Sequence, residues 1–162
     1  MVHRYNSPIV KLKDYTYTGI MWIKVVTWCV DQLVAIGDSY GNVKFFHLWT
    51  EIEQASMNVS IFPGTDILSI QKISGTTQVI VVTTWDVVIL DYTTYSKVGV
   101  DMQASSRPYV AVHGQFGNDL VYVCDNDGEC SAWIGSTGVL INTFSESLKY
   151  DYFMLVISEY GL

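Results

Sequence analysis

The chain alternates short apolar runs with turns of polar residues and glycine. Each run is four to nine residues long and rich in Val, Ile, Tyr, Phe and Trp. Runs of this length and composition are typical of β-strands, and the periodicity of an amphipathic helix is almost absent. The pattern therefore predicts an all-β protein, with strands over residues 9–13, 20–28, 32–38, 42–49, 59–62, 67–73, 78–84, 87–92, 98–102, 109–113, 120–125, 130–134, 140–144 and 152–158.

One pattern occurs three times along the chain. Residues 33–46 align without a gap with residues 120–133, at an offset of 87 residues. Residues 79–91 repeat the design halfway between them, with a turn that is about one residue shorter. Each copy has a strand that is apolar on both faces, which is typical of a sheet packed between two other sheets. The period of about 43 residues lies within the range expected for the four-stranded blade of a β-propeller.

These copies resemble the WD-repeat β-propeller family. Residues 33–47 are similar to the strand, turn and strand that end its repeat, with Phe-His in place of the family's Trp-Asp pair. Residues 120–134 keep the tryptophan as Trp133, and residues 79–91 keep the aspartate as Asp91. The family's Gly-His pair is missing from all three copies, so the hydrogen-bond network that it implies is not carried over.

The resemblance implies a partial or open β-propeller in a single segment. We expect about three four-stranded WD-like blades, at residues 19–62, 66–105 and 108–146, with flanking strands at 8–14 and 150–159. Propellers typically have about 4 to 8 blades, so three blades do not close into a ring. Either the chain is a segment of a longer propeller, or a second chain completes the ring.

Charge and hydropathy narrow the class of protein. The chain has 9 Lys and Arg against 16 Asp and Glu, a net charge of -7, and its cations are scattered. A nucleic-acid partner is therefore not expected, because phosphates would be repelled. No apolar run approaches the length of a membrane span, and residues 1–8 lack the apolar core of a signal peptide. We expect an intracellular protein, cytoplasmic or nuclear, with no membrane span.

No cofactor, metal site or catalytic site is predicted. Cys29, Cys124 and Cys130 are odd in number and lack zinc-site spacing, so we expect buried thiols in a reducing compartment. Residues 125–129 place oxygen donors on alternate positions, as calcium prefers, but they also fit a plain hairpin turn. No motif of a known hydrolase or phosphate-binding loop occurs. A small hydrolase that uses His113 and Asp125 is the weakest alternative.

Turn residues are the predicted contacts with partners. Tyr40, Trp85, Asp86 and Asp127 lie in predicted hairpin turns, and we expect them to be exposed. The resemblance implies a non-catalytic scaffold for protein–protein interactions, a subunit of a multiprotein complex whose partners include a chain or segment that completes the propeller. The alternative is a lectin-like propeller, in which Trp and Tyr side chains stack on sugar rings.

Overall fold

The computed structural model describes residues 22–50, 52–60, 62, 64–103, 108–113, 119–125, 127 and 129–144. These residues form three antiparallel sheets of four strands each, which confirms the predicted all-β class. None of them belongs to a helix that is long and apolar enough to cross a membrane. The first sheet consists of β1 (Ile23–Val30), β2 (Leu33–Asp38), β3 (Asn42–His47) and β4 (Ile52–Asn58). The second consists of β5 (Ile67–Lys72), β6 (Gln78–Thr83), β7 (Val87–Asp91) and β8 (Ser96–Met102), and the third of β9 (Pro108–His113), β10 (Leu120–Asp125), β11 (Cys130–Ile134) and β12 (Val139–Phe144).

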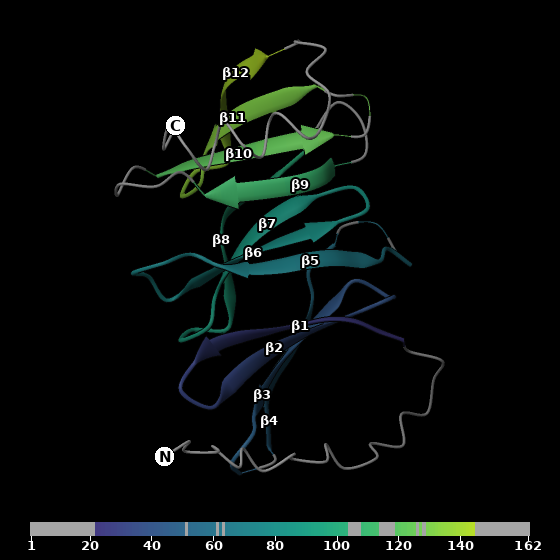
Figure 1. Ribbon diagram of the computed structural model, residues 1–162, viewed down its shortest axis with the longest axis vertical. Helices are drawn as coiled ribbons and strands as arrows, with labels where there is room; N and C mark the ends of the chain where they lie inside the picture. The colour runs from purple at the N-terminus through teal and green to yellow at the C-terminus, as the bar shows by residue number, and fades with distance from the viewer. Residues whose placement is uncertain are drawn as a thin grey trace, which may run out of the picture.

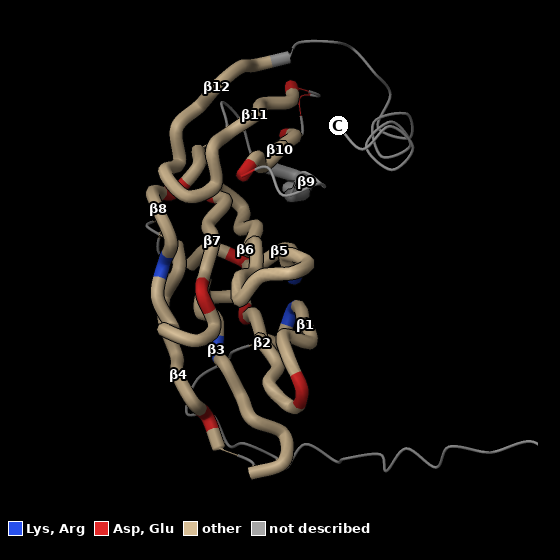
Figure 2. The backbone as a smooth tube through the Cα atoms, turned by 90° about the vertical axis from the view of Figure 1, so that its left-hand side faces the viewer, with Lys and Arg blue, Asp and Glu red and all other residues tan. Residues whose placement is uncertain are grey.

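Within each sheet the strands pair with their neighbours in sequence order. The three sheets lie one above the other, in chain order (Figure 1). Strands β4, β8 and β12 lie along one side of this stack, and β1, β5 and β9 lie along the opposite side (Figure 2). Each sheet therefore has an inner edge strand, which is β1, β5 or β9, and an outer edge strand, which is β4, β8 or β12. Only the second sheet is covered on both faces by another described sheet.

One predicted strand is wrong. The fourth strand of the first sheet is β4, and not residues 59–62. β4 carries Glu53, Gln54 and Ser56 and is mostly exposed, so it lacks the apolar pattern on which the prediction depended. Val59 belongs to the apolar run on which the prediction of a strand at residues 59–62 depended, and it is buried in the link between the first two sheets. The other strands lie within three residues of their predicted ends, and the strands predicted at 9–13 and 152–158 lie outside the described residues.

The strand registers confirm the internal repeat. Between the second and third strands, five residues separate the last paired residues in the first and third sheets, and four separate them in the second. The turn in the second copy is therefore one residue shorter, as predicted. The hairpins between the third and fourth strands are equal, with four residues between the pairs His47–Ile52, Asp91–Ser96 and Ile134–Val139.

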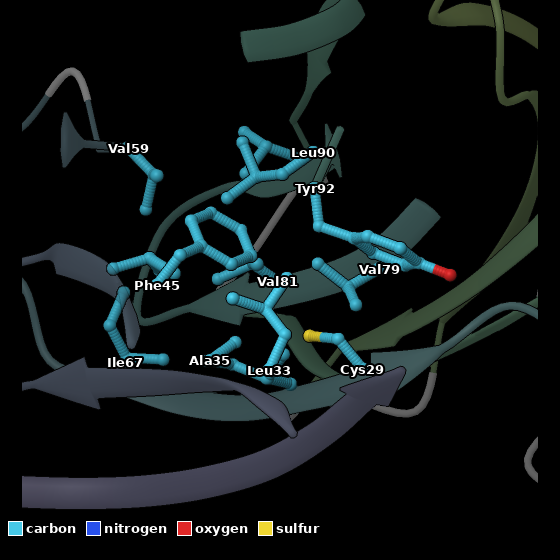
Figure 3. Packing of buried hydrophobic residues seen from close by; sticks show 13 residues of the cluster. Cys29, Leu33, Ala35, Phe45, Val59, Ile67, Val79, Val81, Leu90 and Tyr92 are labelled. Carbon is cyan, nitrogen blue, oxygen red and sulfur yellow. The ribbon is translucent and has the colours of Figure 1, made fainter. Parts of the chain in front are cut away.

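The core lies between the sheets. Because successive side chains of a strand point to opposite faces, Val79 and Val81 of β6 pack against the first sheet, and Ile80 and Val82 pack against the third. Phe45 lies at the centre of the first of these clusters, and it is fully buried (Figure 3). Both faces of the two central strands of the second sheet are thus dry, which explains why β6 and β7 are apolar at nearly every position.

Two glycines allow the second and third sheets to approach closely along the outer side of the stack. A Cβ atom at Gly99 would lie 2.5 Å from the carbonyl oxygen of Ser136, and one at Gly138 would lie 2.6 Å from that of Val100. Both glycines also have a positive φ, of 71° and 65°. These contacts are with backbone atoms, so a side chain at either position would force the two sheets apart.

We predict that Gly99→Ala destabilises the protein more than Gly75→Ala does. Gly75 has a similar φ of 76° but has no atom within 4 Å of its Cβ position, so it is a matched control for backbone strain alone. The control is expected to lower the free energy of unfolding by about 1 kcal/mol. Gly99→Ala is expected to lower it by about 2–4 kcal/mol, because the clash adds to the strain. Equal losses in urea denaturation would contradict the close approach of the two sheets.

Asp91 fixes the turn between β7 and β8. Its Oδ1 accepts hydrogen bonds from the backbone N–H groups of Thr93 at 2.7 Å and Thr94 at 3.2 Å, and its Oδ2 accepts one from the Thr77 hydroxyl at 2.7 Å. Desolvation opposes ionisation of this carboxyl group. The hydrogen bonds from Thr93 and Thr77 and from the turn backbone outweigh it, and they lower the pKa of Asp91 to about 2.

We predict that Asp91 contributes a pH-dependent part of the stability. Its pKa is lower in the folded state than its ordinary value of 3.8, so this contribution is present above pH 3.8 and disappears as the pH falls toward about 2. At neutral pH, Asp91→Asn is expected to lower the free energy of unfolding by about 1 kcal/mol, a figure that allows for solvent screening. Urea denaturation between pH 7 and pH 2 measures the difference between the two proteins. A difference in the free energy of unfolding that is as large near pH 2 as at pH 7 would be evidence against this role. The control is Asp127→Asn, because Asp127 lies in an exposed turn.

Candidate interaction surfaces

Three equivalent turns lie at one end of the sheets, and two of them are capped by an aspartate. Asp38 Oδ1 accepts hydrogen bonds from the backbone N–H groups of Tyr40 at 2.8 Å and Asn42 at 2.9 Å. Asp125 Oδ1 accepts the equivalent bonds from Asp127 and Glu129, both at 3.0 Å. Side chains of Asp commonly stabilise turns in this way. These carboxylates therefore have a structural role in holding the turn tips in place.

In the second sheet a threonine replaces the capping aspartate. Thr83 Oγ1 accepts hydrogen bonds from the backbone N–H groups of Trp85 at 3.1 Å and Asp86 at 2.8 Å. The smaller hydroxyl group suits this turn, which is one residue shorter than the other two. The backbone N–H of Trp85 is therefore held by a side chain of its own turn, like that of Tyr40 in the first turn.

The structure places three of the four predicted contact residues at the surface. Tyr40 and Trp85 are 45% and 42% exposed, and Asp127 is exposed as well. The expectation of exposure is wrong for Asp86, which is completely buried. Its Oδ2 accepts a hydrogen bond from the Ser60 hydroxyl at 2.8 Å, so the carboxylate ties the turn of the second sheet to the link that follows the first.

A further exposed aromatic residue lies beside Trp85. The ring of Phe62 is 6.0 Å from the ring of Trp85, with the two planes inclined at 55°. Phe62 belongs to the link between β4 and β5, and the backbone of this residue donates a hydrogen bond to Ser60 Oγ at 3.1 Å. We call Tyr40, Phe62 and Trp85 the turn-end surface. The sequence did not indicate Phe62, because residues 59–62 had the pattern of a strand.

A small open pocket lies beside the third sheet. It has a volume of about 300 Å³, and Trp133 forms part of its wall, with its indole N–H donating a hydrogen bond to Ser131 Oγ at 2.7 Å. The described residues that line it are Gln103, Asp125, Glu129, Ser131, Trp133, Leu140 and Thr143. Within the described ranges, no group of three or more His, Cys, Asp and Glu side chains is placed to hold a metal ion.

The two residues of the hydrolase alternative are not brought together. In the pairing of β9 with β10, His113 lies opposite Val121, whereas Asp125 lies opposite Pro108. The two positions are thus at opposite ends of the same pair of strands, about 13 Å apart at the usual rise per residue. This separation is too large for a catalytic pair.

The prediction of three thiols is wrong for two of the cysteines. Cys124 and Cys130 lie opposite each other on β10 and β11 and form a disulfide. Disulfides persist mainly in oxidising compartments, so the thiols no longer argue for a reducing one, and the intracellular location stays a prediction. Cys29 is a buried thiol, as expected, and burial raises its pKa to about 11.

No protein-family model matches the sequence, and no curated protein matches it either. Solved structures are similar in fold. The computationally designed Ika4 protein has a TM-score of 0.63 and 16% identity, over 78% of this chain and 74% of that chain. The computationally designed Ika8 protein has a TM-score of 0.62 and 16% identity, over 75% of this chain and 36% of that chain.

The third similar structure is that of the RRP9 WD40 repeats. Its TM-score is 0.65, with 9% identity, over 80% of this chain and 40% of that chain. The chain therefore spans less than half the length of the Ika8 and RRP9 chains. At these identities the likeness shows the fold alone. With the three open four-stranded sheets that its described residues form, this chain has the fold of a partial, WD40-like β-propeller.

Proposed function

We propose that the chain is a non-catalytic scaffold that binds protein partners through the turn-end surface, as a subunit or part of a multiprotein complex. The observation that carries this proposal is the exposed aromatic pair Phe62 and Trp85, held where the first and second sheets meet. Aromatic side chains are enriched among the residues that dominate binding energy, because they bury a large area with few rotatable bonds.

The rigidity of the surroundings supports a binding role for this surface. Thr83 fixes the turn that carries Trp85, and Asp38 fixes the turn that carries Tyr40. The buried bond between Ser60 and Asp86 joins the link to the second turn. An anchor that is already ordered loses little conformational entropy when a partner binds. The proposal also includes a chain or segment that completes the propeller, because the three sheets formed by the described residues are too few to close a ring.

We predict that Trp85→Ala weakens binding of protein partners by about tenfold or more, the cost of truncating a typical anchor residue. The chain is used as bait in extracts of its source cells, and each recovered protein is then purified and titrated against the variants. Trp49→Ala is the matched control, since Trp49 is also an exposed tryptophan, 79% exposed, but lies in the hairpin between β3 and β4. Partners should bind this control as tightly as the unaltered chain.

A glycan array distinguishes the scaffold proposal from the lectin-like alternative. In that alternative the same aromatic rings would stack on sugars. Binding to a glycan that Trp85→Ala abolishes, with no protein partner sensitive to that change, would overturn the scaffold proposal. Protein partners that bind the unaltered chain and Trp85→Ala with the same affinity would show that the turn-end surface is not their binding site.

A further inference from the structure

The end of β4 carries a triplet that accepts N-linked carbohydrate. Asn58, Val59 and Ser60 have the required form, which is Asn, then any residue except Pro, then Ser or Thr. No other asparagine of the sequence begins such a triplet. A match this short can arise by chance, so its place in the fold decides whether it can carry the modification.

The place of Asn58 suits a bulky modification. Asn58 is the last residue of β4, an outer edge strand, and its side chain is exposed. Its Nδ2 donates a hydrogen bond to the carbonyl oxygen of Tyr40 at 3.4 Å. The amide nitrogen of an asparagine carries two hydrogens, and linkage to a sugar replaces one of them. The remaining N–H can therefore keep this contact while the carbohydrate extends into solvent.

The other two residues of the triplet are held by the fold. Val59 is fully buried, and its backbone N–H donates a hydrogen bond to the carbonyl oxygen of Gly41 at 2.8 Å. The Ser60 hydroxyl donates to Asp86 Oδ2 at 2.8 Å. A transferring enzyme needs this hydroxyl group and an extended triplet. Transfer must therefore precede the folding of this link, and the fold then holds the modified asparagine at the surface.

An independent observation in the third sheet points to the same kind of compartment. Cys124 and Cys130 form a disulfide between β10 and β11. Disulfides form and persist in the lumen of secretory compartments and outside the cell, and they are rare in the cytosol. N-linked carbohydrate is added in the same lumen. The expected intracellular location depended partly on free thiols, and two of the three cysteines do not have them.

We propose that Asn58 is a site of N-linked glycosylation and that the chain matures in an oxidising secretory compartment. The donor is an oligosaccharide carried on a lipid diphosphate. Nδ2 of Asn58 attacks the anomeric carbon of the oligosaccharide and forms the new bond to it. The bond between that carbon and the diphosphate oxygen breaks, the lipid diphosphate leaves with the electron pair, and Nδ2 loses one proton. This location differs from the intracellular one that the sequence predicted, and the experiment decides between them.

Mass spectrometry of the full chain purified from its source cells tests the proposal. We predict an intact mass above the chain mass of 18.2 kDa, and loss of the excess when an N-glycosidase removes the carbohydrate. This enzyme converts the modified asparagine into aspartate, so the peptide that contains position 58 identifies the site. Alkylation of the same sample without a reductant shows whether Cys124 and Cys130 are joined.

Substitutions separate the modification from the structural role of the triplet. Asn58→Gln is expected to abolish the carbohydrate and to keep the fold, because it disturbs only an exposed hydrogen bond. Asn142→Gln is the matched control, since Asn142 is an exposed asparagine of the outer strand β12 and begins no such triplet. This control should keep the carbohydrate in full.

Ser60 tests the requirement for a hydroxyl group. Ser60→Ala should abolish the carbohydrate, and Ser60→Thr, which keeps a hydroxyl group, should retain it. Ser60→Ala also removes the hydrogen bond to Asp86. If circular dichroism shows that Ser60→Ala is unfolded, Asn58→Gln provides the same test with that bond intact.

Three outcomes would overturn the proposal. They are an unmodified asparagine at position 58 in the chain from source cells, carbohydrate that persists in Asn58→Gln, and free thiols at both Cys124 and Cys130. These results are independent of the proposed function, because Trp85→Ala leaves the triplet intact and should carry the same carbohydrate. An unmodified chain that loses its protein partners on Trp85→Ala would refute the glycosylation and retain the scaffold. A glycosylated chain that binds no protein would do the reverse.

Discussion

Burial of both faces of a sheet is the constraint on which the rest of this structure depends. The strands β6 and β7 are apolar at nearly every position, so the second sheet is stable in water only when another sheet covers each of its faces. The first and third sheets do this. In turn they are left with one face each that no described sheet covers, and the stack therefore has two apolar ends.

In the proposed function, the same stacking also determines which surface binds a partner. Strands that are packed on both sides hold their turns rigidly, and the caps from Asp38, Thr83 and Asp125 order the backbone at each tip. The turn-end surface thus joins residues from two sheets and the link between them. Aromatic rings on such a support can bind with little loss of entropy, whereas the carboxylates beside them serve the turns.

Much of this fold could be predicted from local pattern. Apolar runs between glycine-rich and polar turns located most of the strands, and the spacing between the copies revealed the repeated sheet. The prediction failed at β4, where an exposed outer strand has few apolar residues to mark it. It also failed at Phe62, because an apolar residue in a link has the same local pattern as one in a strand.

The sequence by itself determined the all-β class, the repeat and the shorter second turn, because each depends on the order of residues along a few strands. The tertiary structure alone decided which polar groups are buried. Asp86 is buried because Ser60, from the link that follows the first sheet, reaches it. Contacts of this kind depend on how distant segments pack, and a pattern read along one segment carries no information about them.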